Sequence, residues 1–202
     1  MENQVLKKQV QEAKKHLLNS EVIAFPTETV MGLGVIYNDY QAYELLNRIK
    51  NRREDKPYTL MVKNISSIDE YAYVDEKIRR VIKAFMPGSL TILLKAKENV
   101  PSYVTHNTGV IGIRIPSNKE ALALLNEVGV PLLVPSANKA GEKPAYNDKE
   151  VKDIFLDELA YIVSGKCLSG VPSTIVDFSK GEPALIREGG ISFKEILEVY
   201  HV

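Results

Sequence analysis

The stretch VIAFPTETVMGLG, residues 22–34, governs the fold prediction. Its first four residues are all apolar and end at Pro26, which is typical of a short buried strand. The small hydroxyl side chains of Thr27 and Thr29 follow, and then Gly32 and Gly34, which allow a backbone to approach a ligand closely. The same residues also suit an ordinary turn after a strand. The spacing is not a dinucleotide-binding motif, because the third glycine is absent.

Helical and strand patterns are interspersed around this stretch. Apolar residues recur at helical spacing in residues 5–18, 39–50, 75–85, 117–129 and from 192 onward. Further strands are expected at residues 59–62, 90–94, 110–115, 132–134, 159–163, 173–178 and 184–187. Helix caps are expected at Asp39, at Ser117 with Glu120 and at Ser192 with Glu195. Strands and helices do not alternate strictly, so we predict one α/β domain over residues 1–202, with a mixed parallel and antiparallel sheet and flanking helices.

The composition is that of an ordinary globular protein. The 202 residues are 45% hydrophobic and 26% charged, which is enough apolar material for a sizeable core. The formal net charge is zero, so no global basic excess favours nucleic-acid binding. The single Cys167 cannot form an internal disulfide, which suits a reducing compartment. Neither a signal peptide nor an apolar run of about 18 residues is present, so we expect a cytoplasmic protein without a membrane segment.

Four cations lie within residues 50–56, near the end of a predicted helix: Lys50, Arg52, Arg53 and Lys56. A solvated helix end, with cations that complement the helix dipole, is the ordinary explanation. The alternative is a clamp for a polyanion, because arginine binds phosphate through two hydrogen bonds and lysine acts as a point charge. In either case we expect Lys50 and Arg52 to lie in an exposed segment.

A second candidate is PSANK, residues 135–139, which follows an apolar strand. Loops at the carboxyl ends of strands are frequent ligand sites in α/β proteins. Ser136 and Lys139 also match the S-x-x-K pattern of serine acyl-enzymes, but the companion S-D-N and K-T-G patterns are missing. We therefore expect ligand binding by Ser136 and Asn138 rather than serine acylation.

Two further strands carry polar residues that need an explanation. Arg114 lies in the middle of an apolar strand, and burying its charge is costly unless it is paired. It therefore faces solvent or meets an anion. Ser173 and Thr174 enter another strand, where β-propensity alone could explain Thr174.

Several kinds of site are not expected. The phosphate-loop motif G-x-x-x-x-G-K-[ST] does not occur. The three histidines, His16, His106 and His201, are too scattered to suggest a metal site, and one cysteine makes a zinc cluster unexpected. Cys167 is predicted to be inert rather than nucleophilic.

In their order and spacing, seven segments resemble the YrdC family across almost the whole chain, from about residue 22 to residue 192. They are PTETVMGLG (26–34), KNRREDKP (50–57), PGSLTILL (87–94), GIRIP (112–116), PLLVPSANKAG (131–141), STIVD (173–177) and LIREGGIS (185–192). The resemblance implies a single twisted α/β domain with a large cavity lined by cations. It also implies one reaction, in which L-threonine, bicarbonate and ATP give threonylcarbamoyl-AMP and pyrophosphate.

The resemblance also implies roles for individual residues. The catalytic residues would be Lys50 and Arg52, which would stabilise the developing charge at the phosphates. The nucleotide would be held by Arg52, Lys56, Ser136, Asn138 and Arg187. The substrate pocket for threonine would be formed by Thr29, Met31, Met61, Arg114, Val134 and Ser173, with Arg114 meeting the carboxylate. Mg²⁺ is expected to enter with the nucleotide, carried by phosphate oxygens and water, with no dedicated protein ligands.

This sequence departs from the family pattern at four positions. Met31 replaces the usual tyrosine and so removes a hydroxyl from the implied threonine pocket. Met61 stands where many members have histidine, Ser89 replaces proline and Ala140 replaces serine. The length is that of the short, single-domain form of the family.

Three other functions remain open at this stage. An RNA-binding module for tRNA or double-stranded RNA is disfavoured by the zero net charge, because phosphate-driven binding needs a basic excess. A carbamoyl-transfer relative from hydrogenase maturation would carry zinc-finger-like cysteines, which are absent here. A paralogue that binds nucleotide without catalysis is suggested by Met31. For the synthase, the implied recipient of the product is a transferase complex that acts on adenosine 37 of tRNA.

Overall fold

The computed structural model describes residues 2–51 and 57–202. Its nine strands form one sheet in the order β7-β1-β2-β6-β3-β5-β4-β8-β9. The strands are β1 (Ile23–Phe25), β2 (Gly32–Ile36), β3 (Thr59–Met61), β4 (Leu90–Lys95), β5 (Val110–Arg114), β6 (Leu132–Leu133), β7 (Tyr161–Ile162), β8 (Thr174–Asp177) and β9 (Ala184–Arg187). The pairs β1–β7, β3–β5 and β4–β8 are parallel, and the other neighbours are antiparallel. The predicted mixed sheet is confirmed.

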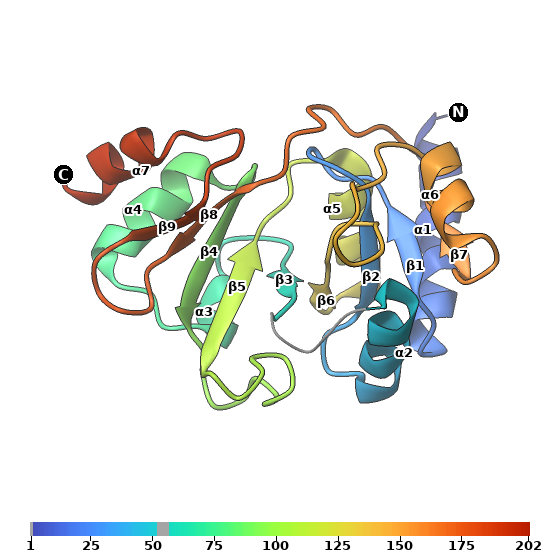
Figure 1. The fold of residues 1–202 in the computed structure, drawn as a ribbon, viewed down its shortest axis with the longest axis horizontal. Helices are drawn as coiled ribbons and strands as arrows, with labels where there is room; N and C mark the ends of the chain where they lie inside the picture. The colour runs from blue at the N-terminus through green and yellow to red at the C-terminus, as the bar shows by residue number, and fades with distance from the viewer. Residues whose placement is uncertain (1, 52–56) are drawn as a thin grey trace.

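Helices flank both ends of this sheet. They are α1 (Glu2–Leu18), α2 (Tyr40–Lys50), α3 (Ile68–Tyr71), α4 (Glu76–Phe85), α5 (Lys119–Val128), α6 (Asp148–Phe155) and α7 (Phe193–Tyr200). Figure 1 shows α3, α4 and α7 beside the β4–β8–β9 end of the sheet, and α1, α2 and α6 beside the β7–β1–β2 end. The polar stretch after β1 runs between these two ends.

The first strand explains why the sheet needs helices on both faces. Successive side chains of β1 point to opposite faces, as the pleat requires. Val22 and Ala24 pack into the core cluster that includes α2, whereas Ile23 and Phe25 pack into the cluster formed with α1 and α5. A strand buried on both faces has an unbroken apolar run, which is the pattern seen in residues 22–25.

Most predicted caps are confirmed. Asp39 accepts a hydrogen bond from the backbone N–H of Ala42 at 3.0 Å, and Ser192 forms a full capping box with Glu195. The prediction for α5 was wrong by one residue. Asn118, not Ser117, is the cap, because its amide oxygen accepts from the N–H of Ala121 at 3.0 Å.

Three elements were not predicted: β2, α3 and α6. The second strand contains Gly32 and Gly34, which lower strand propensity. A side chain at position 34 would place its Cβ only 2.7 Å from Cε1 of Phe25, so the glycine permits the close pairing of β1 with β2. The helix α6 follows the polar loop and begins at the cap Asn147, which accepts from the N–H of Glu150 at 3.0 Å.

Candidate active site

An open cavity of about 170 Å³ lies between the two halves of the sheet. Its wall comes from the β1–β2 stretch, from β3 with the segment before it, from β4, β5, β8 and β9, and from the loop after β6. The lining residues are Thr27, Thr29, Val30, Met31, Gly32, Pro57, Tyr58, Thr59, Met61, Thr91, Arg114, Val134, Pro135, Ser136, Pro144, Pro172, Ser173, Ile175 and Arg187.

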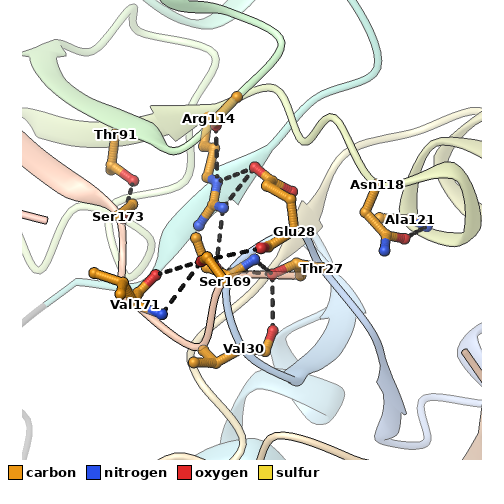
Figure 2. A network of polar contacts seen from close by, with 12 residues as sticks. Thr27, Glu28, Val30, Thr91, Arg114, Asn118, Ala121, Ser169, Val171 and Ser173 are labelled. Carbon is orange, nitrogen blue, oxygen red and sulfur yellow. Dashed lines mark hydrogen bonds and ion pairs between the residues drawn. The ribbon is translucent and has the colours of Figure 1, made fainter. Parts of the chain in front are cut away.

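One end of the cavity is organised by a buried ion pair (Figure 2). The Arg114 side chain, at the end of β5, is only 8% exposed, and the Glu28 side chain is 6% exposed. Oε1 of Glu28 accepts from Nη2 of Arg114 at 2.6 Å and from Nε at 3.2 Å. Arg114 Nε also contacts the carbonyl oxygen of Gly88 at 3.3 Å. The buried arginine therefore has an anionic partner, as burial requires, and the sequence analysis did not name Glu28 as that partner.

The hydroxyls of the β1–β2 stretch form a directed chain that starts at this arginine. Nη2 of Arg114 donates to Oγ1 of Thr29 at 3.0 Å. The two threonine hydroxyls, of Thr27 and Thr29, are 2.8 Å apart, and Thr27 donates to the carbonyl oxygen of Val30 at 2.7 Å. Because the Thr27 proton goes to Val30, Thr29 must donate to Thr27. The lone pair and the proton of the Thr29 hydroxyl are thus both oriented before a ligand binds.

A second arginine approaches the same end from β9. Arg187 donates from Nε to the carbonyl oxygen of Ser173 at 3.0 Å and from Nη2 to its hydroxyl at 3.3 Å. The Ser173 hydroxyl is 2.9 Å from the hydroxyl of Thr91. Partial burial of the Arg187 guanidinium at the cavity wall, together with repulsion from Arg114, lowers the pKa of Arg187 from its usual value. Two guanidinium groups therefore face one small region, which is suited to binding an anion.

A second part of the cavity wall, called the loop end below, is formed by the loop after β6, and Lys50 is its anchor. Nζ of Lys50 donates to the carbonyl oxygens of Ser136 at 2.7 Å and Asn138 at 2.8 Å, and to the Asn138 side-chain oxygen at 3.1 Å. The Lys50 carbonyl accepts from the N–H of Ala140 at 2.9 Å. Lys50 is 3% exposed. The expectation that it lies in an exposed segment was wrong, because the ammonium is enclosed by the loop that it holds.

The side chains of this loop are mainly bonded to one another. Ser136 donates to Oδ1 of Asn138 at 2.6 Å, and Nδ2 of Asn138 donates to the carbonyl oxygens of Lys139 at 3.0 Å and Glu142 at 2.8 Å. Ser136 lines the cavity, whereas Asn138 lies behind it and fixes the turn. The loop therefore presents a rigid rim to the cavity.

The S-x-x-K arrangement of a serine acyl-enzyme is not formed. Nζ of Lys139 donates to the carbonyl oxygen of Ile49 at 2.7 Å and to Glu158 at 2.5 Å, and it lies 5.0 Å from the centre of the Phe155 ring. Ser136 donates to Asn138 instead of to Lys139. A nucleophile needs a base within hydrogen-bond reach, and here the lysine fastens the loop to α2.

Three predicted pocket residues form the apolar wall between the two ends. Met31 is 0% exposed, Met61 is 1% exposed and Val134 is 7% exposed. Met31 packs into the core cluster that includes α2, whereas Met61 and Val134 pack into the cluster with α1 and α5. These three side chains border the cavity but are almost entirely buried in the core beneath its surface. The predicted residues Arg52 and Lys56 lie outside the described residues.

The predicted site residues did not include Glu28, Thr91 or Tyr58, and Thr27 was named only as a hydroxyl of the stretch after the first strand. Glu28 carried a signal, since it is the acidic residue within the stretch that follows a buried strand, and a buried arginine needs a carboxylate. Tyr58 lines the cavity and donates to Oδ1 of Asn47 at 2.6 Å, which ties the wall to α2. Thr91 carried no signal beyond its place in a strand.

Two features are absent from the described part of the chain. Within residues 2–51 and 57–202, no three His, Cys, Asp or Glu side chains are grouped so that they could hold a metal ion. Over the same residues, no helix is both long enough and apolar enough to cross a membrane.

Comparisons with known proteins agree with this architecture. The family model Sua5_yciO_yrdC, described as "Telomere recombination", matches residues 15–189. The chain is 35% identical over 191 residues to a Bacillus subtilis (strain 168) protein named threonylcarbamoyl-AMP synthase, which covers 93% of this chain and 55% of that protein. The crystal structure of P. abyssi Sua5 complexed with L-threonine is similar with a TM-score of 0.91 and 30% identity, over 96% of this chain and 57% of that chain.

The crystal structure of E. coli YciO is similar with a TM-score of 0.88 and 30% identity, over 94% of this chain and 93% of that chain. The chain thus spans about half the length of the Bacillus and P. abyssi proteins and nearly all of YciO. The family match, the fold and the order of the cavity-forming segments agree with one another, and the chain belongs to the Sua5/YciO/YrdC family.

Proposed function

We propose that this chain is a threonylcarbamoyl-AMP synthase, which makes threonylcarbamoyl-AMP and pyrophosphate from L-threonine, bicarbonate and ATP. The observation that carries the proposal is a single cavity with two differently built polar ends. One end has two arginines and oriented hydroxyls, and the other has a rigid loop anchored by a lysine. The name of the Bacillus relative and the L-threonine bound to the P. abyssi protein support the proposal.

The amino-acid end would hold threonine by its carboxylate. Guanidinium groups bind carboxylates through charge-assisted hydrogen bonds, and Arg114 and Arg187 both line this end. The Thr29 hydroxyl, whose proton goes to Thr27, could only accept a hydrogen bond from the amine or hydroxyl of threonine, and the Ser173 hydroxyl lies at the same end. Holding the carboxylate fixes the position of the amine, which is how binding lowers the entropy cost of the next step.

The reaction would form two bonds in turn. The threonine amine attacks the carbon of bicarbonate, and loss of water gives a carbamate. A carbamate oxygen then attacks the α-phosphorus of ATP, and the bond to the pyrophosphate oxygen breaks. Phosphoryl-type transfers of this kind need positioning and charge stabilisation more than a covalent nucleophile.

The loop end would hold the nucleotide phosphates. Ser136 lines the cavity there, and Asn138 and Lys50 fix the loop behind it. We assign Lys50 to ordering this loop, which changes its role from direct phosphate contact. Arg52 and Lys56 are proposed to supply the cations that meet the phosphates and the developing charge.

Mg²⁺ is proposed to enter with ATP. The described residues that line the cavity include hydroxyls and arginines but no carboxylate. This wall fits an ion whose ligands are phosphate oxygens and water, which is how Mg²⁺ is usually held beside a nucleotide. The ion would supply charge neutralisation at the phosphates.

Pyrophosphate release tests the proposal. Purified protein would be incubated with ATP, Mg²⁺ and bicarbonate, with and without L-threonine. The proposal predicts release that requires both threonine and bicarbonate, and a product whose mass is that of threonylcarbamoyl-AMP. Release that is independent of threonine would overturn it.

A second candidate is a paralogue that binds nucleotide without making this product. The observation that favours it is the apolar wall at Met31 and Met61, where the family pattern has tyrosine and often histidine. ATP binding without threonine-dependent pyrophosphate release would support this candidate. An RNA-binding role would appear instead as a gel shift that weakens steeply with salt.

The product would serve in the threonylcarbamoyl modification of tRNA. It is a mixed anhydride, so a transferase acting at adenosine 37 is the proposed recipient. The arrangement of residues 1–202 as one domain and the cytoplasmic location also stay predictions.

A further inference from the structure

Glu28 does not line the cavity, but it holds the side chain of Arg114, which does. It is 5% exposed and lies behind Arg114, whose Nε and Nη2 both donate to the same carboxylate oxygen. The other bonds of this guanidinium go to neutral oxygens, on Gly88 at 3.3 Å and on Thr29 at 3.0 Å. Glu28 is therefore the anionic contact that fixes how Arg114 faces the cavity.

The second oxygen of the same carboxylate is informative. Oε2 of Glu28 is buried and has no hydrogen-bond partner among the described residues. A buried polar atom without a hydrogen-bond partner destabilises the folded state. The contact of Oε1 with Arg114 has to offset that cost, so the carboxylate is present for its effect on the arginine.

The pairing also sets the charge of this end of the cavity. Among the described residues that line the cavity, the charged ones are Arg114 and Arg187. Glu28 offsets the charge of Arg114 at 2.6 Å, whereas the hydrogen bonds of Arg187 go to the neutral oxygens of Ser173. The described charges at this end therefore sum to one positive charge, which lies on the exposed Arg187. The Glu28–Arg114 pair itself is buried, where charge interactions are much stronger than in water.

We propose that Glu28 is a positioning residue, which fixes Arg114 and offsets its charge, so that this end of the cavity takes a group with one negative charge, such as an amino-acid carboxylate, in preference to a phosphate dianion. This selectivity keeps phosphate groups at the loop end. The inference rests on the proposed function for its natural ligand, but its charge argument holds for any anion.

The test is a calorimetric titration with L-threonine and, separately, with inorganic phosphate at pH 8. The phosphate affinity that counts is the affinity of the site from which threonine displaces phosphate. Glu28→Gln keeps the size of the side chain and removes its charge. Removing the negative charge of Glu28 raises the net positive charge of this end by one, and this change favours a dianion over a monoanion. We therefore expect the ratio of phosphate affinity to threonine affinity to rise about tenfold or more in this variant. An unchanged ratio would contradict the proposal.

Two further variants separate the charge effect from damage to the fold. Glu120→Gln removes a different buried carboxylate, whose recorded ion pair is with Lys119, and should leave the ratio unchanged. The double variant Glu28→Gln/Arg114→Gln has the net charge of the wild type and no unpaired buried charge. In the double variant the ratio of phosphate affinity to threonine affinity should return to the wild-type value, although threonine itself should bind weakly because Arg114 is lost. A ratio as high as that of Glu28→Gln would contradict the charge argument.

Failure of the Glu28 proposal can be distinguished from failure of the proposed function. If the wild-type protein released no pyrophosphate, the synthase proposal would fail, and the two titrations would still test Glu28. If threonine did not bind at all, direct phosphate binding would carry the test, with about tenfold tighter binding expected for Glu28→Gln than for the wild type.

Discussion

The two polar ends of the cavity hold their buried cations in different ways. Arg114 is paired with a carboxylate, Glu28, at 2.6 Å. Nζ of Lys50 donates to three neutral oxygens, two from the backbone and one from the side chain of Asn138, at 2.7 to 3.1 Å. The first arrangement pairs the cation with a carboxylate and fixes the side chain, whereas the second uses the hydrogen bonds of the cation to fix a loop.

Each cation therefore controls a different part of the molecule. At the Arg114 end, one side chain sets both the geometry and the charge, so a single substitution should alter ligand selectivity. At the Lys50 end, the lysine sets the path of residues 136–140, so its loss should act through the loop.

The largest expected effect is on stability, at the Arg114 end. Glu28→Ala leaves a buried guanidinium without its anionic partner, which should lower the free energy of unfolding by about 3–5 kcal/mol. Urea denaturation measures this. The matched control is Asp69→Ala, which breaks the Arg79–Asp69 pair, whose aspartate side chain is 45% exposed, and should cost at most about 1 kcal/mol. Equal losses in the two variants would contradict the assignment of a structural ion pair at Glu28.

The second effect is on turnover, at the loop end. Lys50→Met keeps the length of the side chain but removes the donor to Ser136 and Asn138, so the rim of the cavity should shift. We expect kcat/KM for ATP to fall about 100-fold, because small displacements of positioning groups have effects of this size. Steady-state pyrophosphate release measures it. Lys149→Met, at a side chain that is 86% exposed, should have normal activity. Normal activity of Lys50→Met would show that the loop does not depend on the lysine.

The third effect concerns the junction between the ends. The Met31 backbone joins them, since its carbonyl accepts from the N–H of Ala137 at 2.8 Å and its own N–H donates to Ala145 at 3.0 Å. Its side chain is fully buried, so Met31→Tyr should overpack the core and cost about 1–3 kcal/mol by thermal or urea unfolding. Met31→Leu, which conserves volume, should cost less. A tyrosine variant as stable as the wild type, with tighter threonine binding, would place this side chain in the cavity instead.

The smallest effect is a pH dependence close to the Arg114 end. Burial, reinforced by the carboxylates of Asp148, Glu28 and Glu120, raises the pKa of the Cys167 thiol above its ordinary value of 9.0. Because the folded pKa is the higher one, the folded state retains the proton as pH rises past about 9, and stability is lost there. The wild type should therefore lose stability above pH 9 relative to Cys167→Ala, and the difference should be constant below that pH. A difference that grew below pH 8 would contradict the shift.

Much of the fold could be predicted because burial leaves a direct trace in the sequence. The run at residues 22–25 is apolar throughout because β1 is buried on both faces. The strand β2 could not be predicted in the same way, since Gly32 and Gly34 are there for close approach to neighbouring residues and have no strand propensity of their own. The displaced cap of α5 differs by one residue between two good capping types, which a pattern alone does not separate.

The site was predictable as a set of residues but not as a set of bonds. Arg114 in an apolar strand indicated that a partner was needed, but the partner, Glu28, lies 86 residues away along the chain. The same holds for Lys50, which looked like a solvated helix end because its acceptors lie 86 and 88 residues further on. Sequence patterns identify a charge that needs an explanation, and long-range topology decides what neutralises it.

Separate titrations of L-threonine and ATP test the central claim, that the two ends of the cavity serve different substrates, most directly. The wild type, Arg114→Gln and Lys50→Met would be compared in the same buffer. We predict that Arg114→Gln weakens threonine binding about tenfold or more and leaves ATP binding within about twofold, and that Lys50→Met does the reverse. If either variant weakened both ligands equally, the division of the cavity into an amino-acid end and a phosphate end would be wrong.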